Sequence, residues 1–170
     1  MDTAVLESPE HESAASDADR TRQLVSFRLA DEEYGIEISK VREIILVGTI
    51  TEVPQTPPYV KGLINLRSTV IPIIDLKLRF GLPEAERTDD TRIVVIDVGG
   101  KTMGVIVDAV NEVLRISPEQ ISPPPAAAVA GLGDKYLTGL AKLENRLLIL
   151  LDIEQLMFDE NWQNEDNAVE

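Results

Sequence analysis

The chain repeats one pattern twice along its length, and this internal duplication is the feature that most constrains its fold. A shift of 69 positions places the segment that begins at Leu24 on the segment that begins at Ile93, and further along the chain the shift becomes 77. The difference of eight residues falls around the proline- and alanine-rich stretch 123–128. The aligned pairs include Gly35 with Gly104, Glu43 with Glu112, Pro54 with Pro123, Tyr59 with Tyr136, Gly62 with Gly139, Leu66 with Leu143 and Asp75 with Asp152. A colinear series of matches with a single gap predicts two structurally similar halves.

Each half consists of short apolar runs separated by turn residues, a pattern typical of β-strands. The stretch 60–76 has two apolar arms around a polar tip, which predicts a β-hairpin, and the stretch 137–153 repeats this plan. The spacing of Val41, Ile44 and Ile45 favours a short turn or helix, and a short closing helix is expected at 153–158. Because no long amphipathic helix separates the strands, the pattern predicts an all-β (mainly β) fold of two small β-barrels rather than a doubly wound sheet.

Charge divides the chain into a core and two tails. The net charge is −14, of which residues 1–20 and residues 159–170 carry −5 each, so residues 21–158 carry only −4. Such acidic tails bury too little apolar surface to fold, and we expect both to be disordered. The folded domain is therefore predicted at 21–158, with an N-terminal half at about 21–88 and a C-terminal half at about 89–158. A mildly acidic core argues against binding to nucleic acid or to anionic membranes.

Residue content argues against several classes of site. The chain has no cysteine, which removes disulfides and thiolate chemistry and fits a reducing compartment. The only histidine, His11, lies in the predicted disordered tail, so a histidine-based catalytic or metal site cannot be assembled in the core. Asp75 and Asp152 could act as paired carboxylates, but their recurrence at one structural position favours strand-end capping. We therefore predict a protein that is not an enzyme and has no cofactor and no metal.

Targeting signals are not apparent. The N-terminus lacks the apolar core of a signal peptide. The longest aliphatic run, 147–151, is far shorter than the ~20 residues that a spanning helix needs. These observations predict a soluble cytoplasmic protein without direct membrane insertion.

Two stretches resemble the CheW family of chemotaxis coupling proteins. They are EEYGIEISKVREII followed by VKGLINLRSTVIPIIDL, and YLTGLAKLENRLLILLDIEQLM, which is similar to the C-terminal signature of that family. The resemblance extends from about Gln23 to Phe158. It implies two five-stranded, SH3-like β-barrels around a shared core. It also implies a non-catalytic adaptor that links the cytoplasmic tips of chemoreceptors to the CheW-like regulatory domain of the histidine kinase CheA, recruited to membrane-associated receptor arrays.

The resemblance further implies that receptors bind in an apolar groove between the barrels. The matching positions of this chain are Val41, Glu43, Ile44, Gly62, Asn65, Arg67, Val107, Val110 and Val113. Structural roles stay open for several of them: the aliphatic residues could belong to the core, Gly62 could be a packing glycine, and Glu43 could be a turn or cap device. One position departs from the family pattern, because Ser68 stands where a glycine usually follows the arginine. Serine is strained at the positive φ that glycine tolerates, so either the turn differs here or Ser68 carries the strain.

Three other functions stay open at this point. The chain could serve a CheA-type array for surface motility or another non-flagellar system. It could be a small nucleic-acid-binding barrel, although the acidic core and the low aromatic content of 4% argue against that. A carboxylate-based enzyme would require a cleft that holds two close acids.

Overall fold

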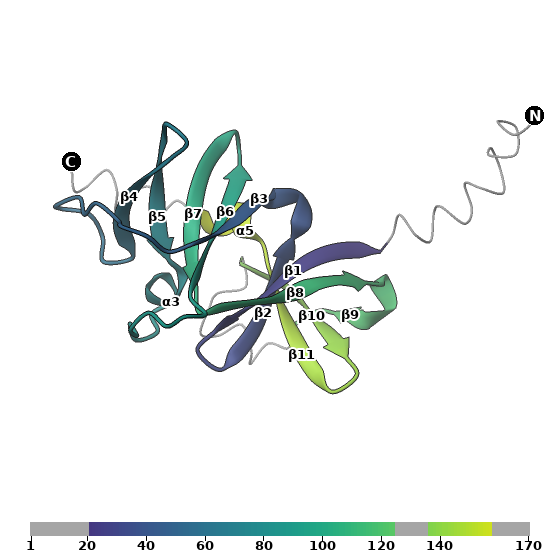
Figure 1. Ribbon diagram of the computed structural model, residues 1–170. Coiled ribbons are helices and arrows are strands. Elements are labelled where there is room, and N and C mark those ends of the chain that lie inside the picture. Colours follow the sequence, from purple (N-terminus) through teal and green to yellow (C-terminus); the bar gives the residue numbers. More distant parts are fainter. Residues whose placement is uncertain (1–20, 125–135, 158–170) are drawn as a thin grey trace, which may run out of the picture.

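The computed structural model describes residues 21–124 and 136–157, and most of these residues are in β-strands (Figure 1). In chain order the elements are β1 (Arg22–Leu29), β2 (Glu32–Glu37), η1 (Ile38–Lys40), β3 (Val41–Leu46), β4 (Val60–Leu66), β5 (Thr69–Asp75), α3 (Leu76–Arg79), β6 (Arg92–Val98), β7 (Lys101–Val107), β8 (Ala109–Ile116), η2 (Pro118–Gln120), β9 (Ile121–Ser122), β10 (Leu137–Leu143), β11 (Arg146–Leu151) and α5 (Ile153–Met157). The mainly β prediction is confirmed. The predicted tails 1–20 and 159–170 lie outside the described residues. Among the described residues, no helix has the length and apolar character of a membrane span.

The strands form two sheets in which equivalent strands follow the same order. Sheet B has the order β3-β6-β7-β5-β4, and sheet A has the order β8-β1-β2-β11-β10-β9. The two sequence shifts convert each strand of sheet B into the strand at the same place in sheet A. The two-residue β9 corresponds to an isolated bridge between Thr51 and Leu63 beside β4. The duplication is therefore preserved in the topology, with five full strands in each barrel, as predicted.

The two sheets do not coincide with the two halves of the sequence. The β1–β2 hairpin, from the first half, lies in sheet A, whereas the β6–β7 hairpin, from the second half, lies in sheet B. Parallel ladders hold the exchanged hairpins in place: Tyr34 of β2 pairs with Ile149 of β11, and Gly104 of β7 pairs with Ile73 of β5. Each half therefore completes the barrel of the other, and the sequence boundary near residue 88 marks the repeat rather than a boundary between sheets.

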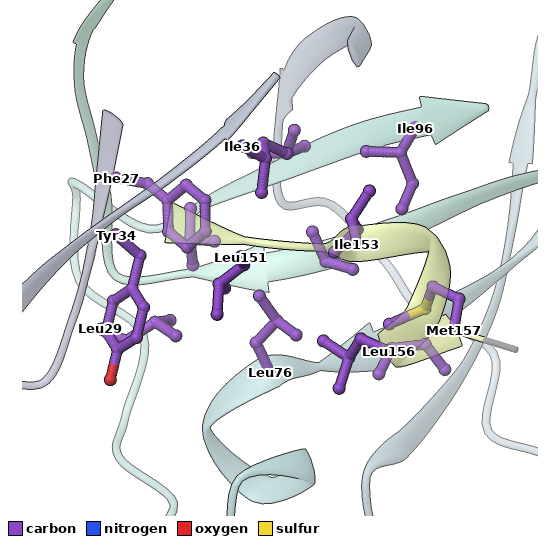
Figure 2. Close-up of a cluster of buried hydrophobic side chains, with 14 of the residues drawn as sticks. Phe27, Leu29, Tyr34, Ile36, Leu76, Ile96, Leu151, Ile153, Leu156 and Met157 are labelled. Carbon is purple, nitrogen blue, oxygen red and sulfur yellow. The ribbon is translucent and has the colours of Figure 1, made fainter. Parts of the chain in front are cut away.

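The largest apolar cluster lies between the two sheets, and α5 contributes to it (Figure 2). Strand β6 shows why this arrangement needs continuous apolar runs. Val94 and Ile96 face the shared cluster, whereas Ile93 and Val95 face a second cluster inside sheet B. A strand that is buried on both faces cannot alternate apolar with polar residues. The side chains labelled in the shared cluster are Phe27, Leu29, Tyr34, Ile36, Leu76, Ile96, Leu151, Ile153, Leu156 and Met157.

Strand β3 corrects one expectation from the sequence. The spacing of Val41, Ile44 and Ile45 favoured a turn or helix, but these residues are extended and pair with β6, and only the short 3-10 helix η1 precedes them. A β-bulge shifts the register between Val41 and Glu43. Because a bulge adds one residue to the strand, it interrupts the regular alternation and produces a spacing that imitates a helix. The expected closing helix is present as α5.

Candidate partner-binding surface

The residues predicted to contact partners lie on β3, on the β4–β5 hairpin, and on the end of β7 with β8. Val41 and Val110 are half-buried against the shared cluster, to which Val107 belongs. These three residues therefore border the same apolar cluster from both sheets. Ile44 of β3 and Val113 of β8 are exposed on edge strands of different sheets, and Asn65 is exposed near the hairpin tip.

Glu43 and Arg67 form an ion pair across the rim of sheet B. The two terminal nitrogens of Arg67 donate to the carboxylate oxygens of Glu43 at 2.5 and 2.6 Å. These hydrogen bonds lower the pKa of Glu43. Because β3 and β4 are the two edges of sheet B, the pair closes the barrel at this end. An ion pair exposed to water stabilises a fold little, so its main effect is to fix the direction of the Arg67 side chain.

The turn that carries Arg67 resolves the question raised by Ser68. Leu66 pairs with Thr69, which leaves a two-residue loop, and its residues Arg67 and Ser68 have φ values of 51° and 72°. Two positive φ values in a two-residue loop define a type I′ turn, the geometry that matches the twist of a β-hairpin. Ser68 therefore carries the strain that a positive φ imposes on a residue other than glycine.

Sheet A has an equivalent ion pair that the sequence did not reveal. Arg146, at the start of β11, lies 2.5 Å from Glu112 of β8 and 3.2 Å from Glu33 of β2. Glu112 aligns with Glu43, but the residue aligned with Arg67 is Glu144. The arginine of the second barrel has moved two residues along the hairpin while keeping the same partner position. The repeated glutamate is therefore the partner of a hairpin arginine in both barrels. Its recurrence in the sequence was the observation that could have indicated this second ion pair.

Exposed apolar side chains accompany both ion pairs. Among the described residues, five large apolar side chains are 40–69% exposed: Ile44, Leu46, Val70, Val113 and Leu147. Four of them form aligned pairs, Ile44 with Val113 and Val70 with Leu147. Exposed apolar groups beside arginine are typical of protein interfaces. Ile44 and Val113 were predicted, whereas the other three were not, because most apolar residues on strands are buried.

Two of the predicted positions offer no surface to a partner in the free chain. The side chain of Val107 is fully buried. Gly62 is also buried, with φ of +143°, and a Cβ atom there would lie 2.1 Å from the carbonyl oxygen of Thr51. Gly62 is required by close backbone packing beside a β-bulge, so both residues can affect binding only through the shape of the barrels.

The two recurrent aspartates cap helices. Asp75 accepts hydrogen bonds from the backbone nitrogens of Lys77 and Leu78 at 3.0 and 3.3 Å, and Asp152 accepts one from Gln155 at 3.0 Å. Burial raises the pKa of Asp75. The predicted capping role at the strand ends is confirmed, with the cap serving the helix that follows each strand.

Comparison with known proteins agrees with this architecture. The family model of the CheW-like domain matches residues 23–160. The chain belongs to the CheW family. Its relatives include chemotaxis protein CheW of Klebsiella aerogenes, 41% identical over 86% of this chain and 88% of that protein, and chemotaxis protein CheW of Treponema pallidum, 38% identical over 85% and 87%. The CheW-family fold is also found in the crystal structure of scaffolding protein TtCheW from Thermoanaerobacter tengcongensis, which is 38% identical with a TM-score of 0.76 and covers 84% of this chain and 95% of that one.

Proposed function

We propose that this chain is a non-catalytic chemotaxis adaptor that links chemoreceptors to the histidine kinase CheA and permits receptor control of kinase activity. The relatives named chemotaxis protein CheW and the solved scaffolding protein support this function. The observation that carries it is the duplicated surface: each barrel presents exposed apolar residues beside an arginine–glutamate ion pair. A chain with two such surfaces can hold two partners at once.

The proposed mechanism is scaffolding in the cytoplasm at membrane-associated receptor arrays. Each interface contributes modest affinity, and joining two of them on one rigid body raises the effective concentration of the partners. Arg67 is suited to a central role, because arginine is enriched at the energetic centres of interfaces and its side chain is 70% exposed. The adaptor would then control the kinase by fixing its position relative to the receptor.

The two kinds of partner are assigned to different parts of the surface. We propose that receptor tips contact the region around Val41 and Val110, where the two sheets meet, together with Arg67 on the rim of sheet B. The kinase regulatory domain, itself CheW-like, would use the exposed apolar ends of the barrels around Val70 and Leu147. The exposed aliphatic groups at these ends fit a barrel-to-barrel interface.

Arg67→Glu tests the receptor surface. The substitution places a negative charge beside Glu43, so we expect weaker receptor-coupled kinase activity with a nearly unchanged melting temperature. The matched variant Arg146→Glu breaks the equivalent pair in sheet A and should leave receptor binding largely intact. Adding Glu43→Arg to Arg67→Glu restores the ion pair with reversed charges, and binding should stay weak because the arginine has moved to β3.

Two outcomes would count against these proposals separately. A large loss of melting temperature in Arg67→Glu would make the arginine structural. NMR titration of the labelled, unmodified chain with a kinase regulatory domain and with a receptor-tip fragment tests the adaptor function itself. Failure to bind either partner would contradict that function.

A further inference from the structure

The relative position of the two sheets depends on two crossings of the chain. Within the described residues, the chain passes from sheet A to sheet B after β2, and it returns from sheet B to sheet A after β7. These two crossings are equivalent under the duplication, because β2 corresponds to β7 and β3 corresponds to β8. The contacts that hold these two crossings in place therefore set the angle between the barrels.

Asp108 is the single residue between β7 and β8, and both of its carboxylate oxygens are engaged. One oxygen lies 2.8 Å from the ammonium nitrogen of Lys77 in α3, and the other accepts a hydrogen bond of 2.7 Å from the backbone nitrogen of Ala30 in the β1–β2 turn. The backbone nitrogen of Asp108 also donates to the carbonyl oxygen of Arg28 at 2.9 Å. One side chain thus joins a helix that follows sheet B to a turn of sheet A.

The second crossing has an ion pair of opposite polarity. Lys40, in η1 between β2 and β3, lies 3.1 Å from Glu154 of α5. Helix α5 follows β11 as α3 follows β5, and Glu154 aligns with Lys77. In the Lys77–Asp108 pair the helix supplies the cation and the crossing supplies the anion. In the Lys40–Glu154 pair these roles are reversed. The first pair is the more buried, with side chains 7% and 20% exposed against 32% and 45%.

Helix α3 makes a further contact that spans both halves. The guanidinium of Arg79 lies 5.2 Å from the ring centre of Tyr59, which precedes β4, and 5.6 Å from that of Tyr136, which precedes β10. A guanidinium over an aromatic ring is attracted by the electrons of the ring face. The tyrosines occupy aligned positions in the two halves, so α3 connects sheet B to sheet A through Arg79 as well as through Lys77.

We propose that the ion pairs Lys77–Asp108 and Lys40–Glu154 are clasps that fix the angle between the two barrels, with Lys77–Asp108 as the dominant one. A buried pair resists separation more than an exposed one, because separation leaves a charge without a counter-ion in a poorly solvated place. Val107 and Val110 flank the dominant clasp, so it also sets the geometry of the predicted receptor groove. The effect on the receptor groove rests on the proposed function, whereas the effect on the angle between the barrels does not.

Distance measurement between spin labels on the free chain tests the clasps. The sequence has no cysteine, so Gln23→Cys on β1 of sheet A and Thr69→Cys on β5 of sheet B, both exposed positions, provide two unique labelling sites. In the parent chain we expect one narrow distance distribution. Asp108→Asn, which removes the charge while keeping an acceptor for Ala30, should broaden the distribution and add a population at longer distance.

Two further variants separate a clasp from a general loss of stability. Lys77→Met leaves no cation stranded at this site and should broaden the distribution in the same way. Asp97→Asn breaks an exposed pair with Arg42 inside sheet B, and it should leave the distribution unchanged. Unchanged distances in both Asp108→Asn and Lys77→Met would overturn the proposal, as would equal broadening in Asp97→Asn. Because no partner is present in the experiment, its result does not depend on the adaptor function.

Discussion

Replacement of Gly62 by alanine should be among the most damaging single substitutions in this chain. The added Cβ atom would lie 2.1 Å from the carbonyl oxygen and 2.8 Å from the carbonyl carbon of Thr51, which are backbone atoms that cannot rotate away. The φ of +143° lies in a region that only glycine adopts readily, so the strain alone is about 1–3 kcal/mol. Relief of the clash requires Thr51 to move, and Thr51 makes two hydrogen bonds to Leu63, at 2.9 and 2.8 Å.

The total effect follows from these two contributions. Loss of both hydrogen bonds adds about 1–3 kcal/mol, since a single backbone hydrogen bond contributes about 0.5–1.5 kcal/mol. We therefore expect Gly62→Ala to lower the free energy of unfolding by about 2–6 kcal/mol. A domain of this kind is stable by about 5–15 kcal/mol in total, so the variant should be marginally folded or unfolded.

The chain supplies controls for each contribution separately. Gly100 has φ of +79° with no atom within 4 Å of an added Cβ, so Gly100→Ala measures the backbone strain, at about 1–2 kcal/mol. Gly139 occupies the aligned position in sheet A, where a Cβ would lie 3.0 Å from the carbonyl oxygen of Ser122, so Gly139→Ala measures mild crowding, at about 1 kcal/mol. Equilibrium unfolding in urea followed by circular dichroism compares the three. A loss in Gly62→Ala no greater than that in Gly100→Ala would refute the clash argument.

Three smaller perturbations test other parts of the structure. Ser68→Gly should raise the free energy of unfolding by about 1 kcal/mol, because glycine removes the strain at φ of 72°, and a loss on urea unfolding would contradict the turn geometry. Asp75→Ala should lose about 1 kcal/mol of helix capping, whereas Asp75→Asn keeps the cap and should be at least as stable as the parent chain at neutral pH. Because burial raises the pKa of Asp75 above 3.8, the parent chain should lose stability relative to Asp75→Asn as the pH rises from 3.8 through the folded-state pKa; parallel pH profiles would argue against burial as the cause. Val70→Asp should leave the melting temperature unchanged, since the side chain is 61% exposed, and should weaken binding of the kinase regulatory domain in calorimetry; equal binding would remove Val70 from the interface.

The sequence predicted what depends on local pattern. Alternating and continuous apolar runs indicated strands, and the aligned glycines, tyrosines and aspartates indicated two similar barrels. The capping role of Asp75 followed from its recurrence at Asp152. These features could be predicted because each follows from a backbone requirement that only a few residue types meet.

The exchange of hairpins could not be predicted in the same way. Strands β1 and β6 have the same apolar pattern and occupy equivalent places, so periodicity does not say which barrel each one joins. The choice is made by parallel pairing of β2 with β11 and of β7 with β5, whose partners are far apart in sequence. Strand β3 was obscured for a different reason, since its bulge disturbs the alternation by which a strand is recognised.

The binding surface was predicted in part, for reasons that are also physical. Arg67 and Ile44 lie on the surface, but Val107 is buried because β7 is covered on both faces. Arg146 was not predicted, because it is displaced by two residues from the position that aligns with Arg67. A side chain as long as arginine can reach the same partner from either position, so residue-by-residue alignment of the two halves misses a conserved contact.

The central claim is that this chain acts by holding a receptor and a kinase together. The most direct test is reconstitution of receptor-containing membranes with CheA kinase, with and without the chain, followed by measurement of kinase autophosphorylation. We expect receptor-dependent kinase activity, and its response to the receptor's ligand, to appear only when the chain is added. Equal activity and equal ligand response without the chain would contradict it.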